Sequence, residues 1–182
     1  MAAICVYCAS GTGIAEAYLE LATAVGARLA ADGHTLVSGG GRVSMMGAVA
    51  RAARAGGAHT TGVIPVHLQG REIADTDADE LLVVDTMRER KKAMDDRADA
   101  FLALPGGIGT LEELFEVWTA GSLTMHAKPV VVLDHDGFYA PLWAFLDGLH
   151  ERGFVRAEAL DRLHRVDTVD AAFAVLDRLL AE

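Results

Sequence analysis

The stretch from Thr35 to Ala55, TLVSGGGRVSMMGAVARAARA, indicates the fold that this chain is expected to adopt. It opens with a short apolar run, passes through three consecutive glycines and continues into a longer amphipathic segment. A short apolar run bounded by glycine is typical of a buried strand, and the segment that follows has the length of a helix. This strand, glycine turn and helix form the unit from which sheets of parallel strands are built.

The same unit recurs along the chain, which implies right-handed crossovers and strands buried on both faces. We therefore predict an α/β fold: one Rossmann-like, doubly wound domain over residues 1–182, with a mostly parallel sheet of about seven strands and helices on both faces. We expect strands at 4–8, 35–38, 59–64, 81–84, 100–104, 130–133 and 164–166, and helices at 14–31, 44–55, 87–97, 110–125, 139–152 and 169–180. The longest irregular segment, 66–80, is expected to cross the top of the sheet as a functional loop.

The charge and hydropathy of the chain argue against two classes of partner. The formal net charge is −10, with 26 acidic against 16 basic residues, whereas proteins that hold a nucleic-acid backbone usually carry a basic stripe. No run approaches the ~20 apolar residues of a membrane span, and the N-terminus does not resemble a signal peptide. We expect no nucleic-acid or membrane partner and a cytoplasmic location.

Two cysteines, Cys5 and Cys8, lie on the first expected strand with C-x-x-C spacing. A zinc site would need a second group of ligands, and the sequence shows no such Cys/His cluster. We interpret the pair as small core residues, with a redox pair as the alternative. No metal and no cofactor are expected.

Two glycine-rich loops follow expected strands, at residues 38–47 and 105–110, on what we take to be neighbouring strand ends. Glycine lets backbone N–H groups approach a ligand, and the start of the following helix favours an anion such as phosphate. Tight turns without a ligand are the alternative. The chain has no Walker sequence, and Gly11-Thr12-Gly13 lacks the third glycine of a dinucleotide fold, so a mononucleotide or sugar phosphate fits better.

Two further segments have both a structural and a functional interpretation. Thr110 and Glu113 have the spacing of a helix capping box, yet Glu113 also lies one turn from the second glycine loop, where it could reach a bound sugar. Residues 87–94 could be a solvated helix face with Lys91–Asp95 and Lys92–Asp96 pairs. Alternatively, Arg90 or Lys91 could be a charge partner for the ligand.

Residues 104–113, LPGGIGTLEE, resemble the P-G-G-x-G-T-x-x-E signature of the LONELY GUY family, the cytokinin riboside 5′-monophosphate phosphoribohydrolases. Residues 87–91, MRERK, are similar to the family's M-x-E-R-K segment, and residues 38–47 are similar to its glycine loop. Arg71-Glu72 resembles a further R-E pair. Many members carry the label of lysine decarboxylases, but no lysine lies where a pyridoxal Schiff base would be expected.

This resemblance implies an activity and a set of site residues. The expected reaction is hydrolysis of the N-glycosidic bond of an N6-modified adenosine 5′-monophosphate, and the expected assembly is a homodimer. Arg90 and Glu113 would be the catalytic pair, with Glu113 stabilising the cationic ribose and activating water. The implied substrate-binding residues are Gly40, Met46, Glu72, Lys91, Gly106, Gly107, Gly109, Thr110 and Thr119.

Some positions depart from the family pattern, and one competing function shares the same loops. Arg88, Ile108 and Ser44 stand where members often have His, Tyr and Gly, and the sequence after the signature helix also differs. The preferred base is therefore the property of the substrate that the resemblance determines least. A non-catalytic nucleotide or molybdenum-cofactor carrier would need the glycine loops but not the Arg90/Glu113 pair. The apolar residues Leu111, Leu114, Phe115 and Trp118 are the expected dimer face.

Overall fold

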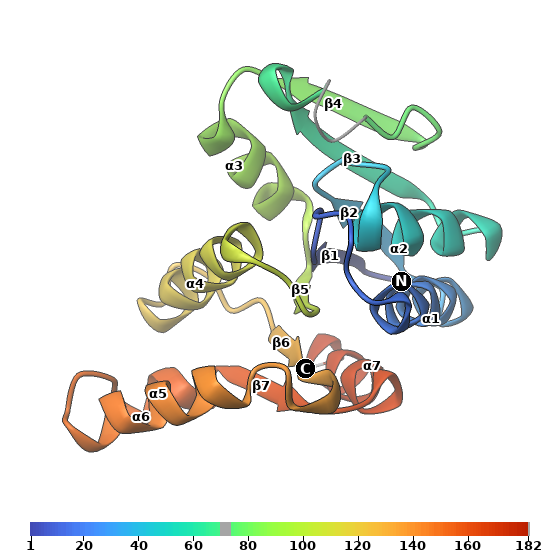
Figure 1. Ribbon diagram of the computed structural model, residues 1–182. Coiled ribbons are helices and arrows are strands. Elements are labelled where there is room, and N and C mark those ends of the chain that lie inside the picture. The colour runs from blue at the N-terminus through green and yellow to red at the C-terminus, as the bar shows by residue number, and fades with distance from the viewer. Residues whose placement is uncertain (70–73, 182) are drawn as a thin grey trace.

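A computed structural model describes residues 1–69 and 74–181 of the chain. Within these residues, seven strands form one sheet in the order β4-β3-β2-β1-β5-β6-β7, and all neighbouring strands are parallel (Figure 1). The strands are β1 (Ala3–Tyr7), β2 (Thr35–Ser38), β3 (Thr60–Pro65), β4 (Glu80–Val84), β5 (Ala100–Ala103), β6 (Val130–Leu133) and β7 (Leu163–Val166). The predicted parallel sheet is confirmed.

The helices cover both faces of this sheet, as predicted (Figure 1). One face carries α1 (Glu16–Ala31), α2 (Ser44–Ala55) and α7 (Val169–Leu180), and the other carries α3 (Met87–Arg97), α4 (Ile108–Ser122) and α5 (Ala140–Glu151). The short helix α6 (Ala157–Asp161), which was not predicted, contacts α4. Two single-turn 3₁₀ helices, η1 (Val66–Leu68) and η2 (His135–Gly137), follow β3 and β6.

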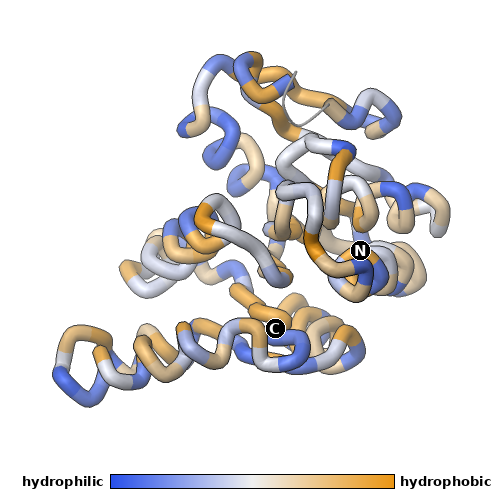
Figure 2. The backbone as a smooth tube through the Cα atoms, viewed as in Figure 1, coloured by the Kyte–Doolittle hydropathy of each residue, from blue (hydrophilic) through white to orange (hydrophobic). Residues whose placement is uncertain are grey.

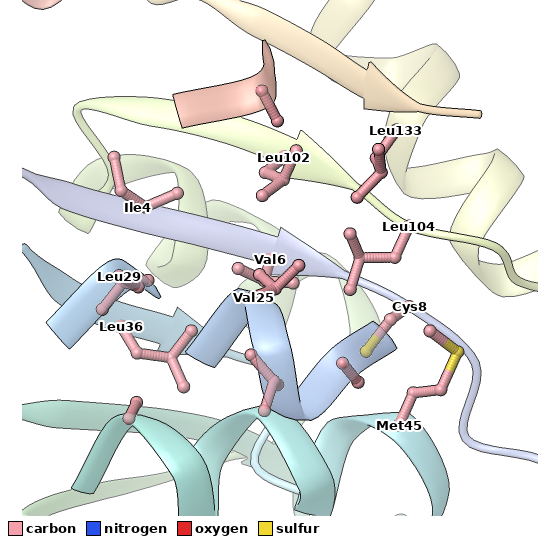
Figure 3. Packing of buried hydrophobic residues seen from close by; sticks show 14 of the residues in the cluster. Ile4, Val6, Cys8, Val25, Leu29, Leu36, Met45, Leu102, Leu104 and Leu133 are labelled. Atoms are coloured by element: carbon pink, nitrogen blue, oxygen red, sulfur yellow. The ribbon is translucent and has the colours of Figure 1, made fainter. Parts of the chain in front are cut away.

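The central strand β1 divides its side chains between two hydrophobic cores. Ile4 and Val6 belong to the core formed with α1 and α2, and Figure 3 shows Val6 beside Val25 of α1. Cys5 and Tyr7 belong to the core under α3, α4 and α5. Because both faces of a parallel strand are buried, β1 is apolar throughout rather than alternating, as predicted.

The two cysteines are buried and free, and they belong to different cores: Cys5 to that of α3 and α4, Cys8 to that of α1 and α2. Burial raises the pKa of both thiols far above the usual range, and the Glu113 carboxylate raises it further. The prediction of two small core residues is confirmed. Cys8 lies one residue beyond the end of β1.

The sheet has its topological switch point between β1 and β5. From β1 the chain adds strands outward to β4, and from β5 it adds strands on the opposite side to β7. Ligands of doubly wound sheets bind at this point, beyond the carboxyl ends of the strands. The glycine loops follow β2 and β5, so β1 lies between them, and the prediction that they follow neighbouring strands is wrong.

Hydropathy differs between the strands and helix α3 (Figure 2). The strands are mostly hydrophobic, whereas α3 beside them is largely hydrophilic. Helix α3 buries two residues, Arg90 and Met94, so one of its contacts with the sheet is made by an arginine. Among the described residues, no helix combines the length and the apolar character needed to cross a membrane.

Candidate active site

A cavity of about 550 Å³ lies at the switch point. The end of β1 forms its floor, and the loops after β2 and β5, helix α3 and the start of α4 form its walls. The residues that line it include Tyr7, Cys8, Gly39, Met45, Met46, Met87, Arg90, Met94, Gly106, Gly107, Ile108, Gly109, Thr110, Glu113 and Phe138. Most of the residues predicted from the sequence thus share one cavity.

The loop after β5 is open toward this cavity. A Cβ added to Gly107 or Gly109 would meet no atom within 4 Å. Gly107 is the N-cap of α4, with extended backbone and no side-chain cap. The first N–H groups of α4 therefore depend on water or a ligand for hydrogen bonds, which is the arrangement that favours phosphate.

The predicted capping box at Thr110 and Glu113 is wrong. Helix α4 begins at Ile108, so Thr110 lies inside its first turn. Thr110 is buried and packs against Gly106, where an added Cβ would lie 2.8 Å from Thr110 Cγ2 and closer still to its other side-chain atoms. Glu113 is accordingly not needed as a capping residue. A capping box does occur at the start of α3, between Thr86 and Glu89.

The open loop is held from behind by two contacts. The Tyr139 hydroxyl donates to the Leu104 carbonyl at 2.7 Å, and the Ala9 N–H donates to the Pro105 carbonyl at 3.2 Å. Burial raises the pKa of Tyr139, so its phenol stays protonated and remains a donor. The turn before α4 therefore has a fixed backbone although its glycines face open space.

The loop after β2 is closed. Gly40 has a φ of +74°, and an added Cβ would lie 3.0 Å from Val63 N. The Gly40 carbonyl accepts a hydrogen bond from Asp75 N at 2.8 Å, and Asp75 is paired with Arg54 at 2.8 Å. The predicted Gly40 is not among the residues that line the cavity, whereas the predicted Met46 is.

Arg90 is 5% exposed and enters the site from α3. Its Nε donates to the Val63 carbonyl at 3.1 Å, and its Nη2 donates to the Gly39 carbonyl at 2.8 Å. Strand β3 and the loop directly after β2 thus orient one guanidinium group at the cavity. A guanidinium has a rigid fork of donors, so these two bonds fix the orientation of the whole group.

Glu113 lies on α4, one turn inside the helix, and is partly exposed in the cavity wall. Its negative charge raises the pKa of Cys5, Tyr7 and Cys8, in each case after the larger effect of burial. Glu113 lines the cavity together with Tyr7 and Cys8, which lie at the end of β1. Arg90 and Glu113 therefore reach the same cavity from helices α3 and α4.

Lys91 and Thr119 line a second space, a groove of about 770 Å³ between α3 and α4. Lys91 pairs with Glu112 and Glu116 of α4, and these carboxylates raise its pKa. Tyr7, Glu112 and Glu113 line both the groove and the cavity, so the two spaces share a wall.

The predicted Lys91–Asp95 pair is wrong, because Lys91 finds its partners across the groove and Asp95 pairs with Lys128 at 2.8 Å. The Lys92–Asp96 pair is confirmed at 2.5 Å.

The predicted Glu72 and its neighbour Arg71 lie outside the described residues. The segment that follows them does reach the carboxyl end of the sheet, since Ala74 forms a bridge with Gly41. For the described residues of the segment 66–80, this agrees with the predicted crossing at the top of the sheet.

Sequence reasoning missed several residues of the site. Tyr7 and Phe138 line the cavity, and Tyr139 supports the open loop. Tyr7 ends β1, and the other two follow β6 closely. Position at the carboxyl end of a strand is the signal that could have identified them.

The fold and the cavity define a Rossmann-like α/β protein whose candidate site lies at the switch point of the sheet. Comparison with known proteins gives the family. Residues 46–176 match the family model described as "Possible lysine decarboxylase". The chain is 56% identical over 169 residues to the cytokinin riboside 5′-monophosphate phosphoribohydrolase of Mycobacterium tuberculosis, with 93% of this chain and 90% of the relative covered.

A second relative, the cytokinin riboside 5′-monophosphate phosphoribohydrolase LOG of rice (Oryza sativa subsp. japonica), is 46% identical over 156 residues, with 86% of this chain and 64% of the rice chain covered. The chain belongs to this family, the LONELY GUY family that its motifs resemble.

Solved structures support the fold alone. The molybdenum cofactor carrier protein of Chlamydomonas reinhardtii superposes with a TM-score of 0.76 at 24% identity, over 100% of this chain and 99% of that chain. DNA processing protein A of Helicobacter pylori superposes with a TM-score of 0.62 at 12% identity, over 97% and 80% of the two chains.

The decarboxylase description does not fit the residues of the cavity. Pyridoxal chemistry needs a lysine that can form a Schiff base. The chain has three lysines, and all three are described: Lys91 pairs with Glu112 and Glu116, Lys92 with Asp96 and Lys128 with Asp95. None of them lines the cavity.

Proposed function

We propose that this protein hydrolyses the N-glycosidic bond of adenosine 5′-monophosphate or an N6-modified form of it, releasing the free base and ribose 5-phosphate. The observation that carries the proposal is the meeting of Arg90 and Glu113 in a cavity whose other wall is the uncapped start of α4. The names of the two relatives, phosphoribohydrolases of riboside 5′-monophosphates, support the same reaction.

In this proposal the open loop binds the 5′-phosphate. The backbone N–H groups at Gly107, Gly109 and Thr110 carry the positive end of the α4 dipole, and the Cβ-free glycines leave room for the phosphate oxygens. Fixing the phosphate holds the ribose in one position. The glycosidic bond is thereby presented to the side chains one helical turn further in.

Cleavage of the ribosyl C–N bond builds positive charge on the sugar and negative charge on the departing base. Glu113 stabilises the cationic sugar and accepts a proton from the attacking water. Arg90 offsets negative charge on the ligand from the opposite wall. The new C–O bond forms as the C–N bond breaks, and the base leaves with the bonding electron pair and takes up a proton.

The base is proposed to lie against the methionine wall of the cavity. Met45, Met46, Met87 and Met94 line it from α2 and α3. Thioether side chains are polarisable and adapt their shape, so they suit an aromatic base with a variable substituent. The groove with Lys91 and Thr119 adjoins this site, and Glu72 remains part of the predicted substrate-binding set.

The proposal is tested by incubating the protein with AMP and with isopentenyl-AMP and following free base by chromatography. Glu113→Gln is expected to lower kcat by at least ~100-fold, because a general base typically contributes 10²–10⁴-fold. Glu151→Gln, an exposed carboxylate on α5, is the matched control. If the wild-type chain binds AMP without releasing the base, the proposed hydrolase activity is wrong and the protein is a nucleotide carrier.

We further propose that one domain, residues 1–182, acts as a homodimer in the cytoplasm. The predicted dimer face needs revision, since Leu114 and Trp118 are 1% and 6% exposed within the chain's own core. Leu123 and Met125, at 65% and 75% exposed beside the groove, are the apolar residues that a second copy would cover. Light scattering on the purified protein tests the dimer, a single cooperative unfolding transition tests the domain, and cell fractionation tests the location.

A further inference from the structure

The guanidinium group of Arg90 occupies the space in which a side chain on Gly39 would lie. A Cβ added to Gly39 would be 3.0 Å from Arg90 Cζ and closer still to Nη2. It would also lie 3.3 Å from the sulfur of Met46. All three residues line the cavity, so the contact belongs to the wall of the site.

The backbone of Gly39 does not itself require glycine. The glycines with positive φ in the described residues include Gly40, at +74°, but not Gly39. An alanine could therefore adopt the backbone conformation of Gly39 without strain. The obstacle to any larger residue is the arginine.

Arg90 cannot move away from Gly39 without a cost in free energy. Its Nε and Nη2 are bonded to the carbonyls of Val63 and Gly39, and the side chain is 5% exposed. A shift of the guanidinium away from Gly39 would break these bonds and leave buried donors and acceptors without partners, which is costly in a protein interior. The methyl group of an alanine therefore competes directly with the position of the guanidinium.

We propose that Gly39 is a positioning residue for Arg90. The absence of a side chain at residue 39, together with its carbonyl, sets where the guanidinium faces the ligand. This inference rests on the proposed function, in which Arg90 acts on the nucleotide. In this proposal, the first glycine of the loop after β2 positions an arginine of helix α3 rather than the phosphate.

The test is a cycle of four proteins: wild type, Gly39→Ala, Arg90→Ala and the double variant. Turnover of AMP and the midpoint of urea unfolding are measured for each. Gly39→Ala alone is expected to lower kcat at least ~10-fold and to lower the midpoint. In the Arg90→Ala background, where the guanidinium is gone, the same substitution is expected to change neither quantity. Gly148→Ala is the matched control, because an added Cβ there meets no atom within 4 Å.

Equal losses from Gly39→Ala in both backgrounds would overturn the proposal, since they would show a structural role independent of Arg90. If Gly39→Ala does not fold, recovery of folding in the double variant supports the proposal and failure of the double variant overturns it. If Arg90→Ala has no measurable turnover, the unfolding midpoints and AMP binding by calorimetry carry the comparison. If the wild type does not cleave AMP, the proposed function fails, while the unfolding midpoints still decide whether Gly39 and Arg90 are coupled.

Discussion

The loops after β2 and β5, each taken with the first turn of the helix that follows, comprise residues 38–47 and 105–110. Both lie at the same edge of the sheet, and both are rich in glycine. In the loop after β2, an added Cβ at Gly47 would lie 2.7 Å from Arg51 Nη1 and closer still to the Arg42 carbonyl. In the loop after β5, an added Cβ at Gly107 or Gly109 would meet nothing within 4 Å. Protein atoms fill the space around the glycines of the first loop, whereas the second loop is open to the cavity.

The difference shows that glycine content alone does not identify a ligand-binding loop. Glycine is used in the closed loop because backbone and side chains approach it closely, and in the open loop because space is left for something else. Substitutions in the two loops should therefore fail in different ways. In the closed loop they should affect stability first, and in the open loop they should affect ligand binding first.

The largest effect is expected for Gly47→Ala in the closed loop. The added methyl group would press on the Arg42 carbonyl, which is backbone and cannot move aside. Overpacking of this kind typically costs 1–3 kcal/mol, and we expect a loss of about 3 kcal/mol in the free energy of unfolding, measured in urea. A loss below about 1 kcal/mol would show that the closed loop is adaptable, and the contrast between the loops would not hold.

The opposite result is expected for Gly109→Ala in the open loop. Alanine has a higher helix propensity than glycine by about 1 kcal/mol, and no protein atom opposes the methyl group, so stability should be unchanged or higher. The methyl group would instead crowd the proposed phosphate position and raise KM for AMP about 10-fold, which corresponds to about 1.4 kcal/mol. Steady-state kinetics and thermal unfolding of the same sample check both parts. An unchanged KM would show that the phosphate does not bind at this loop.

A smaller effect is expected for Tyr139→Phe, which removes the support behind the open loop. The Leu104 carbonyl would lose a buried hydrogen bond of 2.7 Å, at a cost of about 1 kcal/mol in the free energy of unfolding. We also expect KM for AMP to rise more than kcat falls, because the phenol acts on the loop and not on the reacting atoms. Equal changes in kcat and KM would argue that Tyr139 does not act through the phosphate-binding turn.

The smallest effect is expected for Ser44→Gly in the closed loop. Ser44 has a φ of +53°, and its buried hydroxyl has no hydrogen-bond partner within the described part of the chain. Left-handed backbone costs a residue with a Cβ about 1–2 kcal/mol, part of which is offset by the greater freedom of glycine in the unfolded chain. We expect a gain of about 0.5 kcal/mol in the free energy of unfolding. Ser44→Ala, which removes the hydroxyl and keeps the Cβ, separates the two contributions.

The fold was largely predictable because strand and helix periodicity are local properties of the sequence. All seven strands begin within one residue of the predicted start and end within one residue of the predicted end, and so do helices α2, α3, α5 and α7. The exceptions have local causes. Helix α4 starts two residues early because Gly107 takes the N-cap in place of Thr110. Helix α6 has only five residues, too few to show a period.

The candidate site was predictable in location and less so in detail. Strand-end glycines pointed to the correct edge of the sheet, and Arg90, Glu113 and Met46 meet there. The partners of these residues depend on contacts between distant segments. Gly39 and Arg90 are 51 residues apart, and Tyr139 and Leu104 are 35 apart. No spacing rule connects such pairs, so the closed loop could not be distinguished from the open one by sequence.

The two hydrogen bonds of Arg90 join α3 to strand β3 and to the loop after β2, 27 and 51 residues earlier in the chain. The proposed nucleotide site is consequently complete only when β2, β3 and α3 are all in their native places. A partly unfolded chain therefore presents no binding site. A ligand that binds the native state alone stabilises it by mass action. Amide hydrogens of α3 should accordingly exchange more slowly with solvent when nucleotide is present, although that helix is the most hydrophilic one packed on the sheet.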